Sequence, residues 1–135
     1  MCLDRLSNEA RDVGILYGIF EVKNGVIHRL FRDSIPFNAD EDGWEHAESI
    51  NIDGMLDCDC SCDRYKTGFH MYESFKDARD KAVQYALINS TRIIIVTFEW
   101  VDMRAQGMTS FPDYASVSVV GDRRPLEIVW DSKHW

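Results

Sequence analysis

The stretch from Thr67 to Val101, TGFHMYESFKDARDKAVQYALINSTRIIIVTFEWV, carries the strongest structural signals in the chain. Ser74 is followed three residues later by Asp77, a pattern close to the capping box that begins many helices. The side chains that recur at helical spacing and make one apolar stripe are Phe75, Ala78, Ala82, Tyr85 and Ala86. This pattern predicts one principal helix at about residues 74–89.

Strands are expected on both sides of this helix. Thr67 to Tyr72 is a short run that predicts a strand before it. Arg92 to Val101 includes Ile-Ile-Ile-Val, and its length and β-branching favour a central strand. Two more strands are expected at residues 115–120 and 126–130, with Gly121-Asp122 turning the chain between them.

The first half of the chain contains a hairpin signal. Ile15 to Val22 and Val26 to Phe31 are rich in β-forming residues and are joined by Lys23-Asn24-Gly25. Asn-Gly between such runs favours a type I′ turn, because both central residues must accept a positive φ. A short helix from Leu3 to Arg11 and a short strand from Ser49 to Ile52 are also expected. The element order predicts an α+β fold, with a mixed, mainly antiparallel sheet and one principal helix packed on it.

Length and composition indicate one domain over residues 1–135, because 135 residues with 45% apolar content can bury a core without disulfides or metal. No apolar run approaches the roughly 20 residues that span a bilayer. The segment from Met1 to Glu9 lacks the basic start and apolar stretch of a signal peptide. We therefore expect a cytoplasmic protein without a membrane partner.

The formal charge of −8, from 23 acids and 15 bases, restricts the possible partners. Such a chain repels phosphate backbones, and its richest basic run, Arg123-Arg124, is only a pair. We therefore expect no direct nucleic-acid binding. An acidic surface suits docking onto a basic protein, although moderate negative charge also simply aids solubility.

The segment from Asp33 to Glu48 has no sustained helix or strand period and predicts a loop, with Trp44 as its anchor to the fold. Acids interleaved with aromatic residues are typical of protein-binding patches. The candidate binding residues are Phe37, Asp40, Glu41, Asp42, Trp44, Glu45 and Glu48. A loop of about 15 residues is uncommon in a compact domain unless it is functional or disordered, and a solvated connection is the alternative.

A cysteine cluster offers a candidate zinc site. In an extended conformation Cys58, Cys60 and Cys62 share one face, and His70 supplies a fourth ligand of a suitable type. Structural zinc sites usually take two cysteines from a C-x₂-C turn, which this spacing lacks. Cysteines that face a core as small hydrophobic residues are therefore the preferred interpretation, and no metal is favoured.

The opposite face of the same segment resembles the opening of a calcium loop. Its oxygen-bearing side chains are Asp57, Asp59, Ser61 and Asp63. Cys62 stands where such a loop needs Gly, and Gly68 stands where it needs a bidentate Glu. The spacing therefore argues against calcium as well.

The run Gly68-Phe69-His70-Met71-Tyr72 and the Ala- and Tyr-bearing helix after it resemble the segment that lines the nicotinamide pocket in the ADP-ribosyltransferase fold. The late strand that begins at Asp113-Tyr114 is similar to the one at whose head that family carries its catalytic acid. The resemblance implies NAD as cofactor, Tyr72 stacking on nicotinamide, and Asp113 stabilising the transition state. It also places His28 in the strand that holds the cofactor.

Other catalytic motifs are missing from the sequence: no G-x-G-x-x-G, G-x-x-x-x-G-K-[ST], H-E-x-x-H or G-x-S-x-G occurs. A Cys–His pair such as Cys62 with His70 or His46 stays open, because such pairs are set by the fold. The sequence favours a small non-enzymatic protein-binding domain without a cofactor. It is similar to accessory proteins of phages and mobile elements, some of which inhibit host proteins in the host cytoplasm. The alternatives are an NAD-dependent ADP-ribosyltransferase-like enzyme and a metal-binding module at the cysteine cluster.

Overall fold

The computed structural model describes residues 5–7, 11–29, 39–47, 68–89, 91–109 and 114–134. The elements follow one another as β1 (Arg5–Leu6), β2 (Leu16–Lys23), β3 (Val26–Arg29), β4 (Glu45–His46), β5 (Phe69–Tyr72), α2 (Phe75–Asn89), β6 (Arg92–Met108), β7 (Ser116–Asp131) and the 3-10 turn η2 (Ser132–His134). Every pairing between the described strands is antiparallel. The predicted α+β fold with one principal helix on a mainly antiparallel sheet is confirmed.

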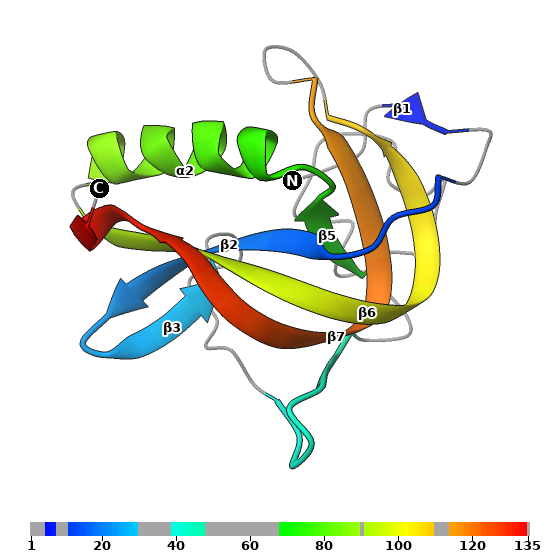
Figure 1. The fold of residues 1–135 in the computed structure, drawn as a ribbon, viewed down its shortest axis with the longest axis horizontal. Helices are drawn as coiled ribbons and strands as arrows, with labels where there is room; N and C mark the ends of the chain where they lie inside the picture. Colours follow the sequence, from blue (N-terminus) through cyan, green and yellow to red (C-terminus); the bar gives the residue numbers. More distant parts are fainter. Residues whose placement is uncertain are drawn as a thin grey trace.

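The two long strands β6 and β7 organise the sheet. They pair with each other along most of their length and bend together (Figure 1). The first half of β6 pairs with β2, and the first half of β7 pairs with β5. A single contact in register, Tyr17 opposite Tyr72, joins β2 to β5. The strands β2, β6, β7 and β5 therefore form a closed cycle of neighbours.

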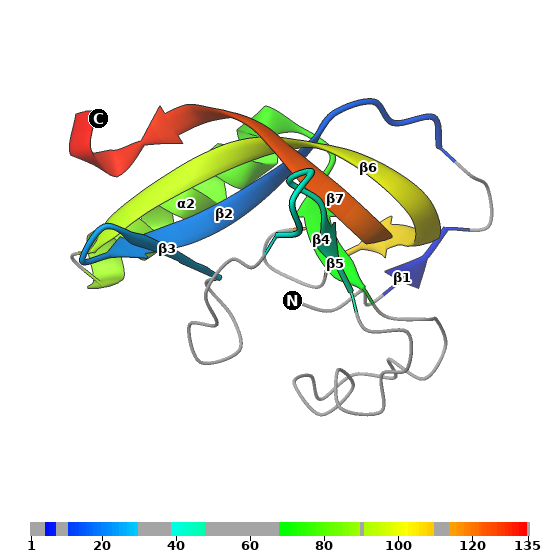
Figure 2. The same cartoon turned by 90° about the horizontal axis from the view of Figure 1, so that it is seen from below.

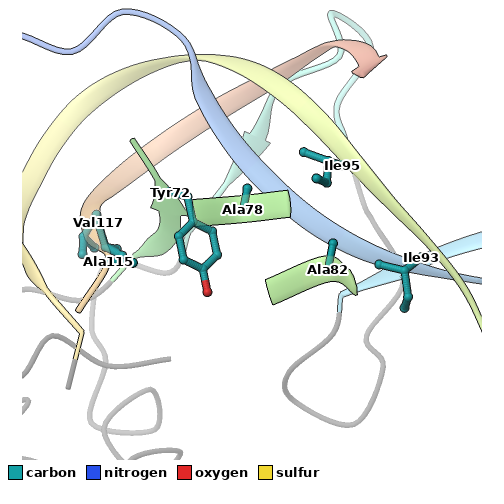
Figure 3. Close-up of a cluster of buried hydrophobic side chains, with 8 residues drawn as sticks. Tyr72, Ala78, Ala82, Ile93, Ile95, Ala115 and Val117 are labelled. Carbon is teal, nitrogen blue, oxygen red and sulfur yellow. The ribbon is translucent and has the colours of Figure 1, made fainter. Parts of the chain in front are cut away.

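Helix α2 covers one face of this sheet (Figures 1 and 2). The hydroxyl of Ser74 accepts a hydrogen bond of 3.2 Å from the Asp77 amide, which caps the first turn as the sequence predicts. Ala78 and Ala82 are fully buried, and their small side chains point toward the sheet in Figure 3. Phe75, Tyr85 and Ala86 are partly buried against the same cluster, so the predicted apolar stripe is confirmed.

A second apolar cluster lies on the other face of the sheet. Neighbouring residues of β6 alternate between the clusters: Ile93 and Ile95 pack beneath α2, whereas Ile94, Val96 and Phe98 pack in the second cluster. Burial on both faces explains why this strand is one continuous apolar run instead of an alternating pattern.

The hairpin of β2 and β3 is confirmed. Asn24 and Gly25 both have positive φ angles, 52° and 78°, as a type I′ turn requires. The strands pair from Phe20 opposite Arg29 to Lys23 opposite Val26. A local turn signal was therefore sufficient to fix this part of the fold.

Three sequence expectations need correction or cannot be compared. The helix expected from Leu3 to Arg11 is wrong at its centre, because Arg5–Leu6 forms β1 and pairs with the end of β6. The turn expected at Gly121-Asp122 is also wrong, because both residues lie inside the continuous strand β7. A Cβ atom at Gly121 would lie 2.1 Å from Asp102 Oδ2, so Gly is needed there for close approach of the strands. The strand expected at Ser49 to Ile52 lies outside the described residues.

Candidate functional site

Residues 39–47 consist of a turn and the short strand β4 that follows it. We call this whole segment the acidic turn; it projects from the sheet beside β7 (Figures 1 and 2). Asp40 organises it. Its Oδ1 atom accepts hydrogen bonds of 2.9 Å from the amides of both Asp42 and Trp44, and its own amide donates to the Trp44 carbonyl at 2.8 Å. Gly43 has a φ of 87°, which favours glycine at this point of the turn. The conformation of the turn is therefore fixed by its own hydrogen bonds.

Strand β4 is the part of the acidic turn that pairs with the sheet. Glu45 pairs with Arg123 of β7, and His46 pairs with Asp122. Because successive side chains of a strand point to opposite faces, the two charged pairs lie on opposite sides of the sheet. We call Glu45–Arg123 the inner pair and His46–Asp122 the outer pair.

The inner pair is almost completely buried, with Glu45 1% and Arg123 4% exposed. Arg123 Nε donates to Glu45 Oε1 at 2.7 Å. The guanidinium carbon of Arg123 also lies 4.1 Å, 4.6 Å and 5.2 Å from the ring centroids of Phe69, Phe98 and Phe20. Cation–π contacts thus surround an ion pair in the apolar interior. The prediction that Glu45 belongs to the binding surface is wrong, because its carboxylate points into the core.

The outer pair is exposed and involves a second acid. His46 Nδ1 lies 2.6 Å from Asp122 Oδ1, and its Nε2 lies 2.8 Å from Asp40 Oδ2. The hydrogen bonds to Asp40 and then to Asp122 raise the pKa of His46 above its ordinary value. The hydrogen bond from His46 is the main cause that lowers the pKa of Asp40. The imidazolium form therefore links the turn to β7.

Trp44 makes a third link to β7. The guanidinium of Arg124 lies over the Trp44 ring, 5.1 Å from its centroid, and also pairs with Glu99 of β6. A Cβ atom at Gly43 would come within 3.5 Å of the Arg124 side chain. Both arginines of the Arg123-Arg124 run thus bind acids of the same chain.

The three links leave Glu41 and Asp42 at the exposed tip of the acidic turn. Asp40 is also exposed, but its carboxylate is engaged by two backbone amides and by His46. Phe37 and Glu48, the remaining predicted binding residues, lie outside the described residues. The hydrogen bonds of the turn define the backbone that carries these two exposed acids, whose carboxylates can pair with Lys or Arg side chains of another molecule.

The sequence reasoning missed Asp122, Arg123 and Arg124 as the support of this turn. One signal was available: Glu45-His46 and Asp122-Arg123 are two dipeptides of complementary charge, and antiparallel pairing places each charge opposite its counterion. A shift of one residue would set Glu45 against Asp122 and turn every side chain of β4 to the wrong face.

A second polar cluster lies near the start of α2 and is fully engaged within the chain. Glu73 accepts hydrogen bonds from Arg11 Nε at 2.9 Å and Arg11 Nη2 at 2.7 Å. It also accepts one from the Ser118 hydroxyl at 2.8 Å. Gln106 Nε2 donates to the Arg11 carbonyl at 2.9 Å, and its Oε1 accepts from the Arg11 amide at 2.7 Å. These contacts tie the segment before β2 to the sheet, which is a structural role.

The residues carried over from the ADP-ribosyltransferase resemblance occupy different surroundings. Tyr72 of β5 is only 4% exposed and packs beneath α2 (Figure 3), so its ring offers no open face for a nicotinamide. His28 lies partly buried in the β2–β3 hairpin. Asp113 lies outside the described residues. The predicted NAD site therefore stays a prediction without added support from the described residues.

The predicted zinc ligands Cys58, Cys60 and Cys62 also lie outside the described residues. The fourth, His70 of β5, is partly buried, and its Nδ1 lies 3.2 Å from the Gly68 carbonyl oxygen. Within the described ranges, no three His, Cys, Asp or Glu side chains are grouped so that they could hold a metal ion.

Comparison with protein-family models, with curated proteins and with solved structures finds no match for this chain. In the part of the chain that the structure describes, no helix has the length and apolar character needed to cross a membrane.

Proposed function

We propose that this chain is a non-enzymatic protein-binding domain that docks through the acidic turn onto a basic surface of another protein. The observation that carries the proposal is the attachment of a projecting acidic turn to consecutive residues of one strand. Asp122, Arg123 and Arg124 of β7 each hold a different residue of the turn. Glu41 and Asp42 are thus presented at an ordered tip, and an ordered tip loses less conformational entropy on binding than a flexible loop.

The overall charge supports the same proposal. With a formal net charge of −8, the chain attracts a basic partner over a distance of about one Debye length. Such steering speeds association, while the two carboxylates at the tip favour a basic contact surface. Trp44 lies half-buried beside the tip and offers the aromatic area that interfaces use. Docking of this kind needs no cofactor, and it fits the inhibition of a host protein by a phage-type accessory protein in the host cytoplasm.

The test compares two variants with the same change in charge. In Glu41→Lys/Asp42→Lys the reversal lies at the tip of the acidic turn, whereas in Asp12→Lys/Glu127→Lys it lies at two exposed acids elsewhere. Tagged wild-type protein and both variants are used for quantitative affinity capture from lysate, followed by mass spectrometry and by association rates on the purified partner.

We expect the tip variant to lose the partner and to associate at least about tenfold more slowly at low salt. Added salt should slow association of the wild type, because screening shortens the range of its charges. The control variant should keep most of the binding. Equal losses in the two double variants would show that total charge, and not the acidic turn, governs binding.

A further inference from the structure

We propose that the protonation of His46 controls the attachment of the acidic turn to β7, so that docking through this turn responds to pH. Only the pH response of docking rests on the proposed function. The attachment itself is a property of the isolated chain and is tested without a partner.

The geometry around the imidazole ring carries the proposal. Its two nitrogen atoms face two different carboxylates, Asp122 Oδ1 at 2.6 Å and Asp40 Oδ2 at 2.8 Å. A neutral imidazole has one N–H donor and one acceptor, whereas a carboxylate is only an acceptor. Both contacts are therefore hydrogen bonds only when the ring is protonated. Loss of the proton leaves one lone pair facing a carboxylate oxygen.

Charged groups on the neighbouring strands have acidic partners of their own. On β7, Arg124 is engaged by Glu99 and lies over Trp44. On β6, Arg104 pairs with Asp102 at 3.0 Å, and both side chains lie against Gly121.

The remaining charges lie on the acidic turn itself. Glu41 and Asp42 of the turn add further negative charge. The inner pair, Glu45 with Arg123, occupies the opposite face of the strands and is neutral as a unit. Among the described residues, the imidazolium of His46 is therefore a cation that contacts both Asp40 and Asp122.

Deprotonation reaches the tip of the turn through Asp40. The carboxylate that binds His46 through Oδ2 also holds the amides of Asp42 and Trp44 through Oδ1. The pKa of His46 is raised, so its contribution is fully present below the ordinary value of about 6.5 and is lost as the pH rises through the raised value. The pKa of Asp40 is lowered, so its own contribution is lost only when the pH falls through that lower value. The acidic turn is thus attached most firmly between these two values.

The first arm of the experiment is a nitrogen-15 NMR titration of the isolated protein, wild type, His46→Gln, Asp122→Asn and the control His28→Gln. We expect the ring nitrogens of His46 to titrate above about pH 6.5, with the amide signals of Asp42 and Trp44 moving at the same midpoint. Asp122→Asn should lower that midpoint, and His28→Gln should leave it unchanged. In His46→Gln the tip amides should show no transition in this range.

A His46 midpoint at or below about pH 6.5, or amide signals of Asp42 and Trp44 that do not follow it, would overturn the proposal that His46 protonation controls the attachment of the acidic turn. The second arm repeats affinity capture at about pH 5.5 and about pH 8 with wild type and His46→Gln. The wild type should capture more partner at about pH 5.5 than at about pH 8, because the acidic turn is attached more firmly at the lower pH. This difference should be lost in His46→Gln. Equal binding by the wild type at both pH values, with partner loss in the tip variant, would overturn the control of docking while leaving the proposed function intact.

Discussion

The inner and outer pairs connect the same two strands through neighbouring residues, yet their environments are opposite. Glu45 and Arg123 are 1% and 4% exposed, whereas the His46 side chain is 57% exposed. The polarity is also reversed: β4 supplies the acid to one pair and the base to the other. A buried pair is little screened by solvent and its loss is severe, whereas an exposed pair contributes modestly and depends on salt and pH. Strand β4 thus contributes to one buried ion pair that solvent hardly screens and to one exposed pair whose strength depends on pH.

The largest effect is expected from breaking the inner pair. Glu45→Ala leaves the Arg123 guanidinium charged and buried among three phenylalanine rings. We expect a loss of about 3–5 kcal/mol in the free energy of unfolding, measured by urea denaturation. The matched control Glu45→Met/Arg123→Met removes both charges and should lie within about 1–2 kcal/mol of the wild type. A mild effect of Glu45→Ala, equal to that of the double variant, would contradict the buried position of the pair.

A smaller effect is expected from Trp44, which joins the acidic turn to Arg124. Trp44→Ala removes the cation–π contact, whose centroid distance is 5.1 Å, and should lower the free energy of unfolding by about 0.5–1 kcal/mol. Trp44→Phe keeps an aromatic ring and should recover part of this loss. Thermal or urea unfolding followed by circular dichroism measures both. A loss above about 3 kcal/mol would show that Trp44 belongs to the core.

The smallest effect is expected at the outer pair, and its size depends on pH. The pKa of His46 is raised in the folded protein, so the wild type should exceed His46→Gln in stability most clearly in mildly acidic buffer. The difference should shrink as the pH rises through the raised pKa. Urea midpoints of the two proteins across a pH series measure it. A difference that grows toward alkaline pH would contradict the imidazolium geometry.

The parts of the fold that the sequence predicted well are those with local causes. The Asn24-Gly25 turn and the Ser74 cap each depend on residues a few positions apart, and both are found as predicted. The helix stripe follows from the 3.6-residue period in the same way. Patterns of this kind are complete within one element and need no knowledge of its neighbours.

The incorrect predictions concern contacts between distant segments. Gly121-Asp122 has the composition of a turn, but Gly121 is there because Asp102 and Arg104 of β6 pack against it. Glu45 has the composition of a surface acid, but its counterion Arg123 lies 78 positions away in the sequence. In the candidate site, Trp44, Asp40, Glu41 and Asp42 could be named from composition. The role of each could not, because it depends on the register between β4 and β7.

The sequence separation of the inner pair also has a consequence for the order of folding. Closing a loop of 78 positions costs more chain entropy than closing a local hairpin or helix, so we expect β4 to dock on β7 after the β2–β3 hairpin and helix α2 have formed. Interactions absent from the folding transition state act on the unfolding rate. Glu45→Ala should therefore speed unfolding in a chevron plot while leaving the refolding rate nearly unchanged, and slowed refolding would instead place this contact in the folding nucleus.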